Sequence, residues 1–190
     1  CALLIGSIVA LPWSRFQWRL AIVPAKTLAL GIYGLFGYHF LLFLAFRTAP
    51  AVQANLVNYL WPLLIVVLAP LFHKHSRLHL RQVLAAFAGF SGAVLVMTNG
   101  QAIDADFNLG YLAALASAFI WATYSLMTQR VAAFHTAAIG YFGFVSGILA
   151  LLCHYLLETP VALSMSDAGL LAWMGIGPLG LAFYLWDAAL

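Results

Sequence analysis

Charged residues are scarce in this sequence. Of its 190 residues, eight are Lys or Arg and five are Asp or Glu, so 7% are charged and 65% are apolar. A water-soluble domain carries about 25% charged residues because its surface must be solvated. The shortage of charge excludes a soluble globular domain and indicates a protein dissolved in lipid. The net charge of +3 forms no basic patch, so nucleic acid is not an expected partner.

Cysteine is also scarce, and the motifs of common enzyme chemistries are missing. Cys1 and Cys153 allow neither a disulfide framework nor a zinc motif. The sequence has no HExxH, no GxSxG, no glycine-rich phosphate loop and no paired carboxylates within an apolar run. We therefore expect no enzyme activity, no metal and no cofactor. His75 and His79 are four residues apart, but they lie in a basic loop whose simpler role is to set membrane topology.

Long apolar runs dominate the sequence. A helix needs about 20 apolar residues to cross about 30 Å of hydrocarbon. A partial run, Ala2 to Leu11, is followed by six nearly complete ones: Thr27 to Phe46, Ala51 to Phe72, Gln82 to Thr98, Leu109 to Thr128, Phe134 to Leu157, and Ala168 to the end. We interpret the partial run as a truncated helix rather than a signal peptide, because no basic segment precedes it. The sequence thus predicts an all-α, polytopic membrane helix bundle with seven helices.

Charge in the loops predicts the orientation. All but one of the Lys and Arg residues fall in alternate loops, whereas the opposite loops hold four of the five acids. Because Lys and Arg concentrate in cytoplasmic loops, we expect the loop Trp13 to Lys26 to be cytoplasmic. The helix after it then runs outward.

A weak internal repeat accompanies the spans. A shift of 143 residues places Gly34, Gly37, Phe40 and Ala45 on Gly177, Gly180, Phe183 and Ala188. The two matching helices are expected to run in opposite directions, and inverted repeats are typical of transporters. Chance matching between glycine-rich membrane helices is the alternative.

Three segments resemble a known family. Residues Gly37 to Pro62 read GYHFLLFLAFRTAPAVQANLVNYLWP, in which NYLWP is the most specific part. Residues Gly110 to Ser125 read GYLAALASAFIWATYS, and the chain ends in GPLGLAFYLWDAAL. These segments closely resemble the drug/metabolite transporter superfamily (EamA-like), specifically its aromatic amino-acid exporter branch.

The resemblance implies a ten-helix fold built from two inverted five-helix repeats. This chain would supply about helices 2 to 8, without helices 1, 9 and 10. Residues 1–98 would form the first EamA-like repeat, 99–108 an external loop between repeats, and 109–190 the start of the second repeat.

Polar and aromatic residues occur at membrane depth. At 1.5 Å per residue, His39, Trp61 and Trp121 lie about 14 to 18 Å into their helices, near the midplane. The candidate substrate-binding residues are Tyr38, His39, Asn58, Tyr59, Trp61, Trp121, Tyr124, Tyr184 and Asp187. We expect Tyr38, Trp121 and Tyr184 to form flat walls for an aromatic ring. Asn58 and His39, with backbone groups freed near Pro62 and Gly175–Gly180, would bind the polar groups.

Each of these residues has an alternative role. Polar and small side chains also hold membrane helices together, as the spacing of Ala85, Gly89 and Ala93 predicts for a packing seam. Asp187, the only acid within a predicted span, either pairs with a cation or reaches interfacial water. His39 is either a proton-coupling group or a neutral structural histidine.

The sequence thus predicts an exporter of aromatic or other apolar amino acids that works by alternating access in a bacterial inner membrane. Substrate class and outward direction come from the resemblance. A transporter of another small metabolite or drug is the first alternative, and a membrane scaffold or enzyme subunit the second. The expected partners are a small-molecule substrate and the lipid bilayer, and no oligomeric state is predicted.

Overall fold

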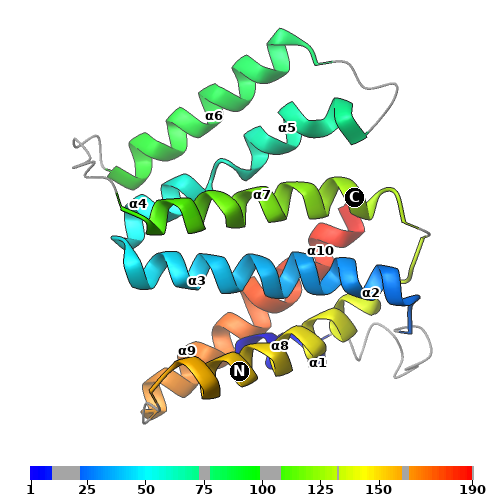
Figure 1. Cartoon of the computed structure of the whole chain (residues 1–190), viewed down its shortest axis with the longest axis vertical. Coiled ribbons are helices and arrows are strands. Elements are labelled where there is room, and N and C mark those ends of the chain that lie inside the picture. Colours follow the sequence, from blue (N-terminus) through cyan, green and yellow to red (C-terminus); the bar gives the residue numbers. More distant parts are fainter. Residues whose placement is uncertain (10–21, 73–77, 99–107, 132, 160–162, 190) are drawn as a thin grey trace. The chain divides into compact units, whose positions relative to one another are not determined.

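The structure is a computed structural model, and it describes residues 1–9, 22–72, 78–98, 108–131, 133–159 and 163–189 (Figure 1). Every regular element in these ranges is helical. In chain order they are α1 Ala2–Val9, α2 Ala25–Ile32, η2 Tyr33–Gly37, α3 Tyr38–Thr48, α4 Ala51–Asn58, α5 Trp61–Phe72, α6 Leu80–Thr98, α7 Gly110–Thr128, α8 Ala138–Leu157, α9 Met165–Ile176, η3 Gly177–Leu181 and α10 Ala182–Ala189. The segments η2 and η3 are π-helical.

Six helical stretches in the described part of the chain are long and apolar enough to cross a membrane. They are Ala25–Thr48, Ala51–Phe72, Leu80–Thr98, Gly110–Thr128, Ala138–Leu157 and Met165–Ala189. The six long apolar runs are therefore confirmed as helices. The partial first run forms α1, which has eight residues, and its predicted end at Leu11 lies outside the described residues. The predicted inter-repeat loop, 99–108, also lies outside them except for Asn108.

Two predicted helix starts were wrong because polar residues cap the helices. Helix α8 begins at Ala138 rather than Phe134, since the ring Nδ1 of His135 accepts the Ala137 N–H at 3.1 Å and holds a turn there. Helix α9 begins three residues before the predicted Ala168. Ser164 Oγ accepts the Asp167 N–H at 3.2 Å, and the Asp167 carboxylate accepts the Ser164 N–H at 2.9 Å. This reciprocal capping box starts the helix at Met165.

The chain divides into two compact units. The first contains Cys1–Phe36 and Val131–Leu190, and the second contains Gly37–Arg130. In the first unit α1 packs against α8, α9 and η3. A Cβ added to Gly6 would lie 2.4 Å from the Leu179 carbonyl oxygen, so glycine is needed for this close approach. Small residues let membrane helices approach in this way.

The second unit is organised around α7. Helices α3, α4 and α5 all pack against it, and α3 also contacts α4 (Figure 1). Where α3 meets the start of α7, the side chains are small: Ala45, Ala49, Ala54 and Ala114 are buried together. A Cβ on Gly110 would lie 2.5 Å from Thr48 Oγ1, whereas Gly37 approaches Ile120. These contacts show that α3 and α7 run antiparallel.

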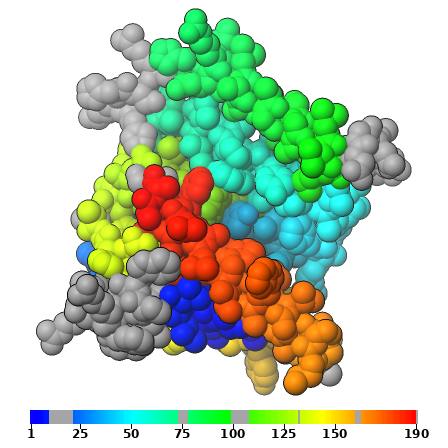
Figure 2. Space-filling model, turned by 180° about the vertical axis from the view of Figure 1, so that it is seen from behind, coloured from blue at the N-terminus to red at the C-terminus, as the bar shows by residue number. Residues whose placement is uncertain are grey.

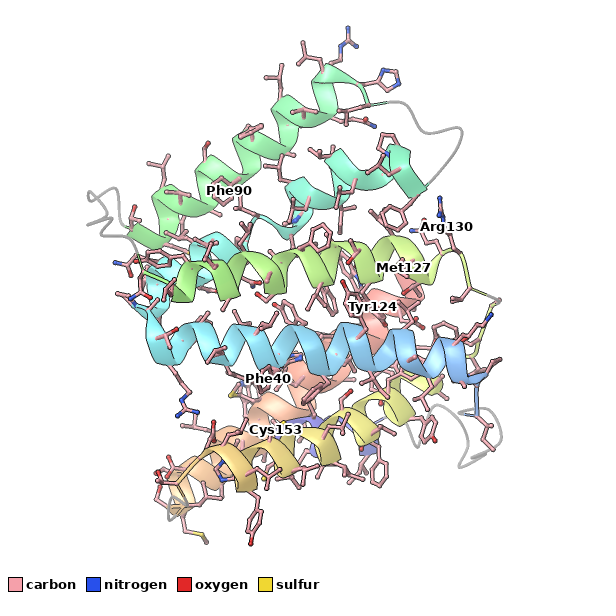
Figure 3. All side chains as sticks on the ribbon, in the orientation of Figure 1. Phe40, Phe90, Tyr124, Met127, Arg130 and Cys153 are labelled. Atoms are coloured by element: carbon pink, nitrogen blue, oxygen red, sulfur yellow. The ribbon has the colours of Figure 1, made fainter. Side chains whose placement is uncertain are left out.

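Arg130 joins the ends of two helices in this unit. Its guanidinium donates to the carbonyl oxygen of Phe72 and, at 3.2 Å, to that of Leu71, the last two residues of α5. The guanidinium carbon also lies 5.1 Å from the centre of the Phe72 ring. Figure 3 shows Arg130 just beyond α7, beside the end of α5. A cation is favourable at this position because the carbonyl end of a helix is partially negative.

Helix α6 packs against α5 and α4 but buries no residue. Figure 2 shows its side chains at the surface along its whole length. The predicted seam of Ala85, Gly89 and Ala93 was wrong for contacts within this chain, because a Cβ on Gly89 meets nothing within 4 Å.

Candidate functional site

A break in one membrane span positions the candidate site. Helix α4 ends at Asn58, and α5 begins at Trp61. Pro62 has no N–H, so it cannot donate to the carbonyl of Asn58, four residues earlier. The Leu60 N–H bonds to Val57 O at 3.2 Å, as in a tighter turn. The predicted interruption near Pro62 is therefore confirmed.

The side chain of Asn58 links three helices just before this break. Its amide nitrogen donates to the Tyr38 hydroxyl of α3 at 3.1 Å. The Ser117 hydroxyl of α7 donates to its amide oxygen at 2.9 Å, while also lying 2.7 Å from the Ala114 carbonyl on its own helix. Asn58 is 3% exposed and Ser117 is fully buried. Both ends of the amide therefore have partners, as a buried amide requires.

A row of aromatic rings lies next to the hydrogen-bonded group of Asn58, Tyr38 and Ser117. The ring of Tyr38 lies 5.1 Å from that of Trp121, and Trp121 lies 5.4 Å from Tyr124, measured between ring centres. His39 lies 4.9 Å from Tyr38 in an edge-on arrangement. These separations are in the range at which aromatic pairs attract. His39, Trp121 and Tyr124 are all buried, and Figure 3 labels Tyr124 on α7.

The two other hydroxyls on the same face of α7 bond to their own helix. Ser125 Oγ donates to Trp121 O, and Thr128 Oγ1 donates to Tyr124 O, each at 2.8 Å. Such bonds satisfy a hydroxyl locally and need no partner helix. Ser117 also donates to the Asn58 amide oxygen on another helix.

Five of the predicted site residues gather in the second unit: Tyr38, His39, Asn58, Trp121 and Tyr124. Two others lie in the same unit, at the break between α4 and α5. Tyr59 is 40% exposed and directly follows the last residue of α4, where its N–H still donates to Asn55 O at 2.9 Å. Trp61, at the start of α5, is partly buried.

Tyr184 and Asp187 belong to the first unit. Tyr184 is buried, and its hydroxyl donates to the Gly6 carbonyl at 3.1 Å, which ties α10 to α1. The Asp187 carboxylate is hydrogen-bonded to the side chain of Thr136. A role for either residue in substrate binding stays a prediction.

Ser117 was not among the predicted site residues. The sequence does indicate its position, because Ser117 precedes Trp121 by four residues and therefore lies on the same face of the helix.

The second unit thus presents flat rings beside an amide, a phenol and a hydroxyl, all of them neutral and mostly buried. An aromatic ring is accommodated by such walls, and polar groups taken from water need hydrogen-bond partners of this kind. This chemistry suits binding rather than bond making.

Residues 1–98, just over half of the chain, match the EamA-like transporter family. The chain belongs to this family. The family resemblance predicted from the sequence is confirmed, and the chain is an integral membrane protein of a transporter family rather than an enzyme family.

Named relatives agree with this assignment. The chain is 41% identical over 160 residues to the aromatic amino acid exporter YddG of Ancylobacter novellus, a match that covers 83% of the chain and 55% of the relative. It is 37% identical over 89 residues to the aromatic amino acid exporter YddG of Salmonella typhimurium, covering 43% and 30%. It is 33% identical over 107 residues to the uncharacterized transporter YyaM of Bacillus subtilis, covering 54% and 34%.

A solved crystal structure has the same fold. It is 37% identical in sequence with a TM-score of 0.87, and the match covers 98% of this chain and 66% of that one. The chain spans about half the length, or less, of the curated relatives that it matches.

Proposed function

We propose that the protein exports aromatic amino acids, and less efficiently other apolar amino acids, across the inner membrane of a bacterium. The observation that carries this proposal is the buried group in which Asn58 bonds to both Tyr38 and Ser117 while the Tyr38 ring lies against Trp121. The names of two relatives support the same substrate class.

The proposed roles follow from the chemistry of each side chain. The rings of Trp121, Tyr38 and Tyr124 provide walls against which an aromatic side chain stacks. Asn58 holds the Tyr38 phenol in place, and the phenol keeps its own O–H to donate to a substrate carboxylate. His39 adds a ring nitrogen near the same group. A substrate with a charged side chain finds no opposite charge among these residues and is expected to be disfavoured.

The transport cycle that we propose is alternating access by two inverted repeats, 1–98 and 109–190. Transporters of this kind bind substrate near the midplane, where interrupted helices free backbone groups, and then rock one repeat against the other. The break between α4 and α5 and the segment η3 are interruptions of this type.

Counterflow in proteoliposomes tests the substrate class. The intact protein that carries this chain is reconstituted into liposomes loaded with unlabelled tryptophan, and entry of labelled tryptophan is followed. We expect saturable entry, competition by phenylalanine and tyrosine, weaker competition by leucine and none by glutamate. Counterflow of no amino acid would contradict the proposal, whereas counterflow of glutamate as fast as of tryptophan would contradict the role of the aromatic walls.

A further inference from the structure

Two spans contain a π-helical segment near their centre. Segment η2, Tyr33–Gly37, interrupts the span Ala25–Thr48, and η3, Gly177–Leu181, interrupts Met165–Ala189. At 1.5 Å per residue, Gly37 and Gly177 each lie about 18 Å from the start of their span, close to the middle of a hydrocarbon core about 30 Å thick. π-Helical turns are rare and occur frequently at functional sites.

The two segments occupy matching positions in the internal repeat. The shift of 143 residues carries Tyr33–Gly37 onto 176–180, which overlaps η3 at four positions. The shift was derived from identities in the sequence, so the coincidence of two rare backbone features is a separate observation.

The two segments have different local causes. In η3, Pro178 lacks an N–H and leaves the Met174 carbonyl without its usual donor four residues later. The Ala182 N–H then donates to the Gly177 carbonyl, five residues back. Segment η2 contains no proline but has two glycines, Gly34 and Gly37.

Packing does not explain the glycine at position 37. A Cβ added there would meet only the end of the Ile120 side chain, at the ordinary contact distance of 3.4 Å. Gly31, six residues earlier on the same span, differs because its Cβ would overlap the Phe142 ring at 2.3 Å. Alanine is favoured over glycine within a helix, so Gly37 gives up helix stability without gaining closer packing.

We infer that η2 is a hinge of the transport cycle, with Gly37 present for bending rather than packing, and that η3 is its counterpart in the second repeat. A kink at a π-helical turn is a recognised site of helix bending. Tyr38 and His39 follow η2 directly, and the chain passes from one compact unit to the other between Phe36 and Gly37. Bending at η2 would therefore move the proposed substrate-binding side chains.

Amide hydrogen exchange tests the hinge without reference to any substrate. In the intact protein in detergent, we expect amides of residues 34–41 to exchange faster than those in the middle of α7. Gly37→Ala should slow this exchange about fivefold after correction for intrinsic rates, which corresponds to the helix preference of alanine over glycine. Gly89→Ala is the matched control, because Gly89 lies in regular helix with nothing near its Cβ.

A transport measurement is the second test of the hinge, and this test rests on the proposed function. We expect Gly37→Ala to lower tryptophan counterflow at least about tenfold with tryptophan binding and thermal stability retained, and Gly89→Ala to change counterflow by less than about twofold. Counterflow of Gly37→Ala within about twofold of the wild type would overturn the hinge. If the wild-type protein transports no amino acid, the proposed function is wrong, and the hinge is then tested by amide hydrogen exchange alone. Slow exchange of the amides of residues 34–41 in the wild-type protein would overturn the hinge.

Pro178→Ala tests the counterpart and keeps the test decisive if Gly37→Ala does not fold. It restores an N–H that can donate to Met174 O, so we expect slower exchange across η3 together with reduced counterflow. Unchanged exchange and transport in Pro178→Ala would contradict the role assigned to η3.

Discussion

Helices α6 and α7 are alike in sequence statistics and opposite in environment. Each has 19 residues, and the mean hydropathy is 1.6 for α6 and 1.3 for α7. Yet the apolar stretch of α6 has none of its residues buried, whereas 56% of that of α7 is buried. Helix α7 carries Ser117 and two of the aromatic rings of the candidate site, Trp121 and Tyr124, and α6 carries large apolar side chains at the surface. Because lipid solvates apolar side chains as well as the protein interior does, hydropathy identifies a span but not its position. Buried polar and aromatic residues distinguish the central helix.

The largest effect that we expect comes from the central ring of α7. Trp121→Ala removes a wall from the proposed site, and loss of aromatic contacts worth about 2 kcal/mol lowers tryptophan counterflow about 30-fold. The control is Phe119→Ala on the same helix, because Phe119 is 47% exposed. It should change counterflow by less than about twofold. Equal losses in both variants would show that position on α7 is irrelevant.

The next largest effect should come from Asn58, which joins α4 to α3 and α7. Asn58→Leu keeps a similar volume but removes two interhelical hydrogen bonds and leaves the Tyr38 and Ser117 hydroxyls without this partner. Each such bond contributes about 0.6 kcal/mol in a membrane protein, and the Tyr38 ring also loses the contact that holds it in place. Together these losses should lower tryptophan counterflow about tenfold. Thermal stability measured in detergent should fall as well. Wild-type transport by this variant would exclude the amide from the site.

A smaller effect is expected from Ser117, and it compares the two helices directly. Ser117→Ala removes only one bond to Asn58, so counterflow should fall about threefold, equivalent to about 0.6 kcal/mol. The matched control is Ser91→Ala, at the surface of α6. It should retain transport. A loss in Ser91→Ala as large as that in Ser117→Ala would contradict the positioning role.

Substitution of Arg130 is expected to have the smallest effect on transport. Its main effect should be on thermal stability. Arg130→Ala removes the donors to the last carbonyls of α5, a loss of about 1 kcal/mol that should lower the melting temperature by a few degrees. Arg130→Lys keeps the charge but not the forked geometry, so it should restore part of this stability. Differential scanning fluorimetry would measure both variants. An unchanged melting temperature in Arg130→Ala would show that this contact does not hold α5 against α7.

The sequence predicted the long helices well because span length is set by the thickness of the membrane. It also predicted the interruptions at Pro62 and in Gly175–Gly180, where proline and clustered glycines disturb the backbone pattern. Helix starts near His135 and Ser164 were missed because they depend on side-chain caps that hydropathy does not detect. Tyr59 is 40% exposed, and its spacing along the helix did not indicate this because burial depends on which helices pack against each face. Segment η2 contains no proline, and only the structure showed it.

Site prediction succeeded where spacing along one helix was sufficient and stopped where a contact between helices was needed. Trp121 and Tyr124 were selected from the same face of α7, and the structure places their rings 5.4 Å apart. The bond from Ser117 to Asn58 joins residues 59 positions apart in sequence, and no local pattern indicates it.

The position of a bound aromatic amino acid tests the central claim most directly. The intact protein would be crystallised with 5-bromotryptophan, and the anomalous signal of bromine would locate the ligand ring. We predict a single strong peak within van der Waals distance of the rings of Trp121 and Tyr38. A peak away from these residues at a ligand concentration that saturates transport would contradict the account.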